Sequence, residues 1–162
     1  MAKQSEDEVI ARVAASLVRR VVGIGMLALL AVIVLYVAIA TPPTFGWQMF
    51  LIAMGTGSLM VANIMRVSTR NTLELTRTEL RDNEGTVLIR IEEITSIDRG
   101  AFAFKPSNGF LLRLKTSQKS DWRPGLWWRA SKRIGVGGMT PMRETKFMAE
   151  MIALLLAERD NT

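Results

Sequence analysis

A run of 45 residues without a charged side chain, residues 21–65, constrains this chain more than any other feature. As one helix the run would be about 67 Å long, roughly twice the hydrocarbon thickness of a bilayer. Pro42 and Pro43 lie near its middle, where they break a helix and favour a turn. The run therefore predicts two membrane-spanning helices, about 21–40 and 46–65, joined by the loop TPPTF.

A cleavable signal peptide is the alternative for the first span, because Ala38-Ile39-Ala40 imitates a small-residue cleavage site. The apolar stretch before that site is about 20 residues, whereas a signal peptide has roughly 7–15. The preceding segment also carries Glu6, Asp7 and Glu8, which is unusual for a signal peptide. Two retained spans, a transmembrane hairpin over residues 21–66, are the favoured interpretation.

The basic residues that flank the spans predict the orientation. Arg19 and Arg20 precede the first span, Arg66 and Arg70 follow the second, and the loop between the spans has no charge. Because cytoplasmic flanks carry the excess of lysine and arginine, both termini are expected in the cytoplasm.

Histidine and cysteine are both absent from the sequence. This excludes disulfides, Cys/His metal sites, cysteine nucleophiles and acid–base mechanisms that use histidine. Glu92 and Glu93 are adjacent on a predicted strand and face opposite ways, so they are poor candidates for paired acid–base work. We therefore expect no catalytic residue, no cofactor and no metal ligand, and a protein that is not an enzyme.

Residues 1–20 are predicted to be a short amphipathic lead-in. Their apolar residues recur at helical spacing: Val9, Ile10, Val13, Leu17 and Val18. This spacing predicts either an extension of the first span or a separate helix at the membrane surface.

The second span contains two pairs of small residues four apart, Ala53 with Gly57 and Ser58 with Ala62. In lipid, small residues let helix backbones approach closely, which is how transmembrane helices associate. These four residues are predicted to pack either on the first span or on an external partner. Because neither span contains an acidic or basic residue, an ion or proton pathway is not expected.

Residues 71–162 predict a small β-rich cytoplasmic domain closed by a helix. NTLELTRTEL alternates apolar and polar residues, RDNEG is a hairpin turn, and further strands are expected in TVLIRI, AFAFK, GFLLRLKT, LWWRA and RIGV. Thr140 as N-cap and Pro141 at the first helical position start a helix of about 141–158. An apolar stripe along this helix is expected to cover the sheet: Phe147, Met148, Met151, Ile152, Leu155 and Leu156. The expected fold is thus a membrane protein of the α+β class, in which a two-helix hairpin precedes a small antiparallel sheet or partial barrel capped by a C-terminal helix.

The order of these elements resembles the bacterial pleckstrin-homology-like domain proteins that carry an N-terminal transmembrane hairpin. The phrases LRDNEG, TVLIRI and IEEITSID carry the resemblance, which covers about residues 71–158. The resemblance implies curled antiparallel strands under one C-terminal helix, and a non-catalytic scaffold that works by binding, often to protein. The lysine and arginine pattern with which eukaryotic pleckstrin-homology domains bind phosphoinositides is not recognisable in LTRTELRDNEGTVLIR, so the resemblance does not imply headgroup recognition.

The net charge of +6 is concentrated in residues 113–133. Seven cations lie there with a single anion, Asp121: Arg113, Lys115, Lys119, Arg123, Arg129, Lys132 and Arg133. Trp122, Trp127 and Trp128 are interleaved with them. Below a membrane such a surface suits anionic lipid or the acidic face of a membrane complex, because basic residues are attracted to anionic headgroups and tryptophan favours the headgroup level.

The predicted contact residues for this partner or lipid are Arg123, Trp127, Trp128, Arg129, Lys132 and Arg133. The alternative is that the cations are only the solvated face of the sheet. Neighbouring residues of a strand point to opposite faces, so one of Trp127 and Trp128 is expected in the core. Nucleic acid would suit the charge, but the membrane tether and the balanced remainder of the chain argue against it.

Gly135, Gly137 and Gly138 precede the C-terminal helix but match neither common phosphate-loop pattern, so a simple turn is expected there. Two functional hypotheses follow. The first is a non-enzymatic accessory subunit, or an assembly or stabilising factor, of a larger integral complex in the bacterial inner membrane. The alternative is a module that binds anionic phospholipid headgroups and organises the membrane.

Overall fold

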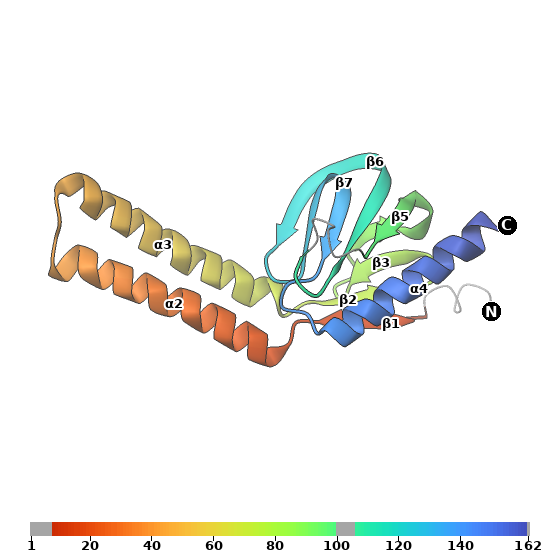
Figure 1. The fold of residues 1–162 in the computed structure, drawn as a ribbon, viewed down its shortest axis with the longest axis horizontal. Coiled ribbons are helices and arrows are strands. Elements are labelled where there is room, and N and C mark those ends of the chain that lie inside the picture. Colours follow the sequence, from red (N-terminus) through yellow and green to blue (C-terminus); the bar gives the residue numbers. More distant parts are fainter. Residues whose placement is uncertain (1–7, 100–105, 162) are drawn as a thin grey trace. The chain divides into compact units, whose positions relative to one another are not determined.

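The computed structural model describes residues 8–99 and 106–161 (Figure 1). The strand predicted in AFAFK lies outside the described residues. The chain divides into two compact units. One is Leu17–Val67, and the other joins the residues before Leu17 to those from Ser68 onward. We describe each unit by itself.

The first unit consists of the helices α2 (Leu17–Ala40) and α3 (Phe45–Ser68), each of 24 residues. Both are long and apolar enough to cross a membrane, which confirms the two helices predicted from the charge-free run. At 1.5 Å per residue each is about 36 Å long, slightly more than the hydrocarbon thickness of about 30 Å. At the turn, Gln48 Nε2 donates to the carbonyl oxygen of Ala38 at 3.1 Å, which satisfies a backbone acceptor at the end of α2.

Small residues let α2 and α3 approach each other. A Cβ atom added to Gly55 would lie 2.5 Å from Cγ of Leu35, so α3 meets α2 closely at this glycine. Ala31, Ala38 and Ala62 are also buried. Close approach at Gly and Ala is the usual way in which helices pack in lipid, where there is no hydrophobic driving force between them.

The second unit contains a four-stranded antiparallel sheet in the order β1-β2-β3-β4. Its strands are β1 (Ala11–Ala14), β2 (Thr72–Leu75), β3 (Glu79–Asp82) and β4 (Val87–Arg90). Strand β1 precedes the two helices in sequence and β2 follows them, yet Ala14 is the Cα partner of Thr72. The helical hairpin is therefore inserted between two neighbouring strands of one sheet.

The helix predicted through the lead-in is wrong for residues 11–14, and α2 begins only at Leu17. Ala11 and Val13 are buried while Arg12 between them is exposed, which is the alternation of a strand. The spacing of the apolar residues in this segment is compatible with a helix and with a strand. Pairing with β2 decides for the strand, because it satisfies the backbone and buries Val13 in the core.

The predicted RDNEG turn joins β3 to β4. Oδ1 of Asp82 accepts the backbone N–H groups of Glu84 and Thr86 at 3.0 and 2.8 Å. Gly85 has φ of +84°, a conformation that favours glycine. The single turn of 3₁₀ helix η1 (Ile91–Glu93) then leads from β4 into the second sheet.

The second sheet has the order β5-β6-β7. Its strands are β5 (Ile94–Asp98), β6 (Phe110–Arg123) and β7 (Trp127–Val136). The strands predicted separately in LWWRA and RIGV are one continuous strand, β7. Over the described residues the two sheets remain separate and close no barrel.

Strands β6 and β7 curve together as an arch, which Figure 1 shows. We use this name, the arch, for residues 110–136. Gly137, after β7, donates its N–H to the carbonyl oxygen of Leu126, before β7, at 2.8 Å. Strand β7 therefore returns to the place where it began. Ser131, in the middle of β7, has φ of +51°, and the β6–β7 register shifts on both sides of its partner Gln118, which gives the bend.

Helix α4 (Met142–Asp160) packs on the sheets as predicted from its stripe: Met148, Ile152 and Leu156 are buried, and Met151 and Leu155 pack partly against the core. Phe147 departs from the prediction, since 49% of it is exposed. The helix also begins one residue later than expected, with Pro141 rather than Thr140 as N-cap and no side-chain cap. At the other end, Nη1 of Arg159 donates to the carbonyl oxygens of Ile91 and Ile94 at 3.2 and 2.6 Å, which fastens the helix to η1.

Candidate functional site

The tryptophan pair of β7 divides between core and surface. Trp127 is 6% exposed and belongs to the hydrophobic core, which confirms that one member of the pair is buried. Trp128 is half-buried, and its indole lies across Gly135: a Cβ atom there would be 2.8 Å from Cζ2 of the ring. The arch thus bends tightly enough for Trp128 to pack on its own strand seven residues later. A glycine at position 135 leaves the room for the ring.

Arg129 connects the arch to the first sheet. Its Nε donates to the carbonyl oxygen of Lys119 at 2.8 Å and its Nη1 to that of Leu88, on β4, at 3.0 Å. Its guanidinium carbon lies 5.8 Å from the ring centroid of Trp127. The planar guanidinium can serve carbonyls of two strands at once because its donors form a fixed fork. Two donors of Arg129 are therefore directed at the protein's own backbone, which its sequence context did not indicate.

The other predicted cations are exposed. Arg123, Lys132 and Arg133 are all open to solvent. Lys132 and Arg133 line a surface depression of about 520 Å³ together with Trp128, Ala130 and Ser131. A second depression, of about 430 Å³, also borders Trp128 and is lined further by residues 120–122 and 129–130. This surface offers an indole between cations, a combination that suits an anionic or acidic partner.

The turn at the end of the hairpin, residues 122–126, is the arch tip. Gly125, at φ of +86°, lies against Thr69 and Met139: a Cβ atom there would be 2.9 Å from Cγ2 of Thr69. Its carbonyl oxygen accepts the N–H of Met139 at 2.9 Å. Met139 in turn accepts the N–H of Ser16 at 2.8 Å. The arch tip is thus fastened to Ser16 and Thr69, the residues that flank the helical hairpin in sequence.

The glycine turn before α4 holds this tip. Gly137 and Gly138 have φ of +141° and +120°, and a Cβ atom on Gly138 would lie 3.1 Å from the carbonyl oxygen of Gly125. Gly138 also donates its N–H to the carbonyl oxygen of Ser107 at 2.8 Å. The expectation of a turn is confirmed, and the close approach of two backbone segments explains why glycines occupy it.

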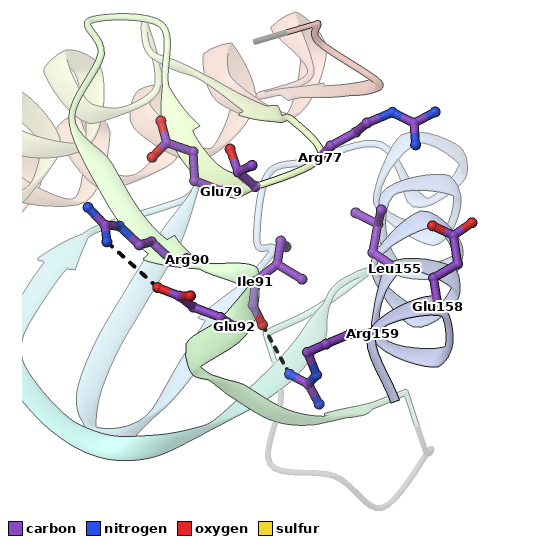
Figure 2. A pocket seen from close by; sticks show the side chains of 9 residues that line it. Arg77, Glu79, Arg90, Ile91, Glu92, Leu155, Glu158 and Arg159 are labelled. Carbon is purple, nitrogen blue, oxygen red and sulfur yellow. Dashed lines mark hydrogen bonds and ion pairs between the residues drawn. The ribbon is translucent and has the colours of Figure 1, made fainter. Parts of the chain in front are cut away.

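A further pocket, of about 600 Å³, lies between the β3–β4 strands, η1 and the end of α4 (Figure 2). Six charged residues line it, three of each sign: Arg77, Arg90, Arg159, Glu79, Glu92 and Glu158. Figure 2 shows Arg90 paired with Glu92, at 3.6 Å, and Arg159 bonded to the carbonyl of Ile91. Because the charges balance and several are already paired, the pocket has no preference for an anion or a cation. Sequence reasoning missed it because its residues come from three separate segments.

The predicted packing residues of α3 do not share one environment. Ala62 is buried and Ser58 is half-buried, with its hydroxyl donating to the carbonyl oxygen of Met54 at 2.8 Å. Ala53 and Gly57 are exposed, and a Cβ atom on Gly57 would meet nothing within 4 Å. Helix α2 therefore leaves the Ala53–Gly57 pair uncovered. The glycine that does meet α2, Gly55, was not among the predicted residues.

Among the described residues, no group of three or more acidic, histidine or cysteine side chains is placed to hold a metal ion. The candidate site is a surface, formed by the exposed side of the arch and its tip. In comparisons with known proteins, no family model, no curated protein and no solved structure matches this chain.

Proposed function

We propose that this chain is a membrane-anchored interaction module without enzymatic activity, an accessory subunit or assembly factor of a larger complex in the bacterial inner membrane. The observation that carries the proposal is the insertion of the two apolar helices between β1 and β2 of one sheet. A pleckstrin-homology-like identity of the second unit is part of the proposal. It is supported by two antiparallel sheets, of four and three strands, and a C-terminal helix.

The connections between the sheet and the helices support a two-span topology. Only residues 15–16 separate β1 from α2, and only residues 69–71 separate α3 from β2. Fully extended, such linkers reach at most about 7–11 Å, far less than the 30 Å or so of a bilayer core. If α2 enters the membrane, α3 must therefore return to the same side. The arginines at these two helix ends favour the cytoplasm for that side, and hence for both termini.

Two uncovered surfaces support a protein partner. The Ala53–Gly57 pair lies on a side of α3 that α2 does not cover, where a further helix could approach closely. The exposed cations Lys132 and Arg133 lie in the other unit and suit an acidic cytoplasmic face. A partner with both a transmembrane helix and such a face would engage both surfaces. A module that binds only anionic lipid would need the cations alone.

The test is purification of the tagged full chain from native membranes in mild detergent, with identification of what accompanies it by mass spectrometry. An integral membrane partner in near-equal amount is expected. Gly57→Leu should weaken its recovery, because leucine fills the surface where a helix would approach. Gly25→Leu is the matched control, since a Cβ atom on Gly25 of α2 also meets nothing within 4 Å. Recovery of this chain alone in every mild detergent would refute the accessory-subunit proposal.

A further inference from the structure

Contacts within the β domain hold the arch tip near Thr69 and, through Met139, near Ser16, the two residues that adjoin the helical hairpin in sequence. Gly125 lies against Thr69, and Thr69 directly follows α3. On the other side of the hairpin, Ser16 directly precedes α2 and bonds to Met139, which also bonds to Gly125. The tip is therefore joined to the points at which the chain enters and leaves the helical hairpin.

We propose that the arch tip, through Trp122 and Arg123, rests in the headgroup layer of an anionic phospholipid bilayer. The inference deepens the proposed function and rests on it, because it requires that α3 crosses the membrane. In this proposal, the part of the basic residues 113–133 that faces lipid is the arch tip. Lys132 and Arg133, in the middle of β7, remain available to a protein partner.

Chain geometry brings the tip within reach of the headgroups. Arg66 is the first charged residue after the apolar run, and Thr69 lies three residues further, about 4–5 Å along the helix axis. The headgroup layer on each side of a bilayer is about 5–7 Å thick. Arg123 is two residues from Gly125, so their Cα atoms are at most about 7 Å apart. The side chains of residues 122 and 123 can therefore reach lipid phosphates beside the end of α3.

The chemistry of the tip fits this position. Trp122 is 58% exposed although it is one of the largest apolar side chains of the domain. Its backbone N–H bonds to Oδ1 of Asp121 at 2.8 Å, which helps to order the backbone beside it. Arg123 is exposed next to it, and Arg70 is exposed beside Thr69. An exposed indole with adjacent guanidinium groups matches the headgroup region, where tryptophan is favoured and arginine binds phosphate.

Fluorescence quenching by lipids with brominated acyl chains tests the inference on the full chain in nanodiscs that contain anionic phospholipid. Trp47 is first replaced by phenylalanine, because it lies near the start of α3 and would itself be quenched. We expect brominated lipid to quench this chain, and Trp122→Phe to remove most of the quenching, since Trp127 is buried and Trp128 packs within the arch. The part of the quenching that is due to Trp122 should fall when the anionic lipid is exchanged for a zwitterionic one. It should also fall in the Arg123→Gln variant.

Gly125→Val tests whether the packing of Gly125 against Thr69 is what holds Trp122 at the headgroups. A side chain at φ of +86°, with its Cβ atom 2.9 Å from Thr69, should release the tip and lower the quenching while Trp122 and Arg123 are both retained. Equal quenching with and without Trp122 would overturn the inference, whether or not Gly125→Val folds. Quenching by Trp122 that Gly125→Val leaves unchanged would also count against it. A chain that alkaline carbonate extracts from native membranes refutes the proposed function itself, whereas an embedded chain with unquenched Trp122 refutes only the tip contact.

Discussion

Replacing Gly135 with alanine should destabilise the arch, because the indole of Trp128 occupies the space that the new methyl group needs. The added Cβ atom would lie 2.8 Å from Cζ2 of the ring and closer still to Cε2 and Nε1. Carbon atoms in contact are normally about 3.5–4.0 Å apart, so the ring would have to move by roughly 1 Å. Gly135 is itself buried, which limits how far the strand can yield.

Forced overpacking of this kind costs about 1–3 kcal/mol of the free energy of unfolding. For a domain of about 100 residues, each kcal/mol lowers the melting temperature by roughly 4–8 °C, so a fall of roughly 4–24 °C is expected. The assay is the temperature at which trypsin begins to cut the arch of the full chain in detergent, followed by mass spectrometry. The exposed lysines and arginines of the arch supply the cleavage sites.

A double-mutant cycle isolates the contact between the two residues. Trp128→Ala removes the ring, so Gly135→Ala should cost much less in that background than in the natural chain. The difference between the two costs is the coupling energy, which for residues in contact is about 0.5–3 kcal/mol. If Gly135→Ala has the same cost in both backgrounds, the indole does not lie on Gly135 and the arch is not bent as described.

Two further predictions use matched pairs of substitutions. Gly55→Leu should destabilise the α2–α3 pair, because the new side chain collides with Leu35, whereas Gly57→Leu should not. Thermal circular dichroism in detergent compares the two variants, and equal effects would contradict the described packing. Arg129→Gln should cost about 1–3 kcal/mol by leaving backbone carbonyls unpaired, whereas the exposed Lys132→Gln should stay within about 0.5 kcal/mol. The temperature at which trypsin begins to cut the arch measures the stability of the Arg129→Gln and Lys132→Gln variants. If the two variants are equally stable, the hydrogen bond from Arg129 to Leu88 of β4 contributes little.

Features that depend on neighbouring residues could be predicted from the sequence. The charge-free run with a proline pair in the middle predicts two apolar helices, because hydropathy and helix breaking act locally. The RDNEG turn and the stripe of α4 were predictable for the same reason: turn chemistry and helical period are properties of short segments. These local signals account for the order of most elements.

The environment of each residue in the candidate site could not be predicted from its neighbours in sequence. Arg123, Arg129 and Lys132 have the same kind of sequence context, yet Arg129 bonds to a carbonyl of β4 while the other two are exposed. Nothing in the pattern distinguishes them, because the distinguishing partner, Leu88, is 41 residues away. The alternation rule predicts that one tryptophan of the pair is buried, but it cannot say that Trp127 is the one.

The sequence by itself determined that this chain has an apolar two-helix segment, a β-rich domain and a capping helix, because each follows from a short-range pattern of hydropathy and turn residues. Only the tertiary structure decided that residues 11–14 form a strand paired with β2 across the inserted helices, and that the arch tip returns to Thr69 and Met139. Both features come from contacts between residues far apart in sequence. The physical reason is that a strand and a bend gain their stability from the partner that satisfies their backbone, and a local pattern does not identify that partner.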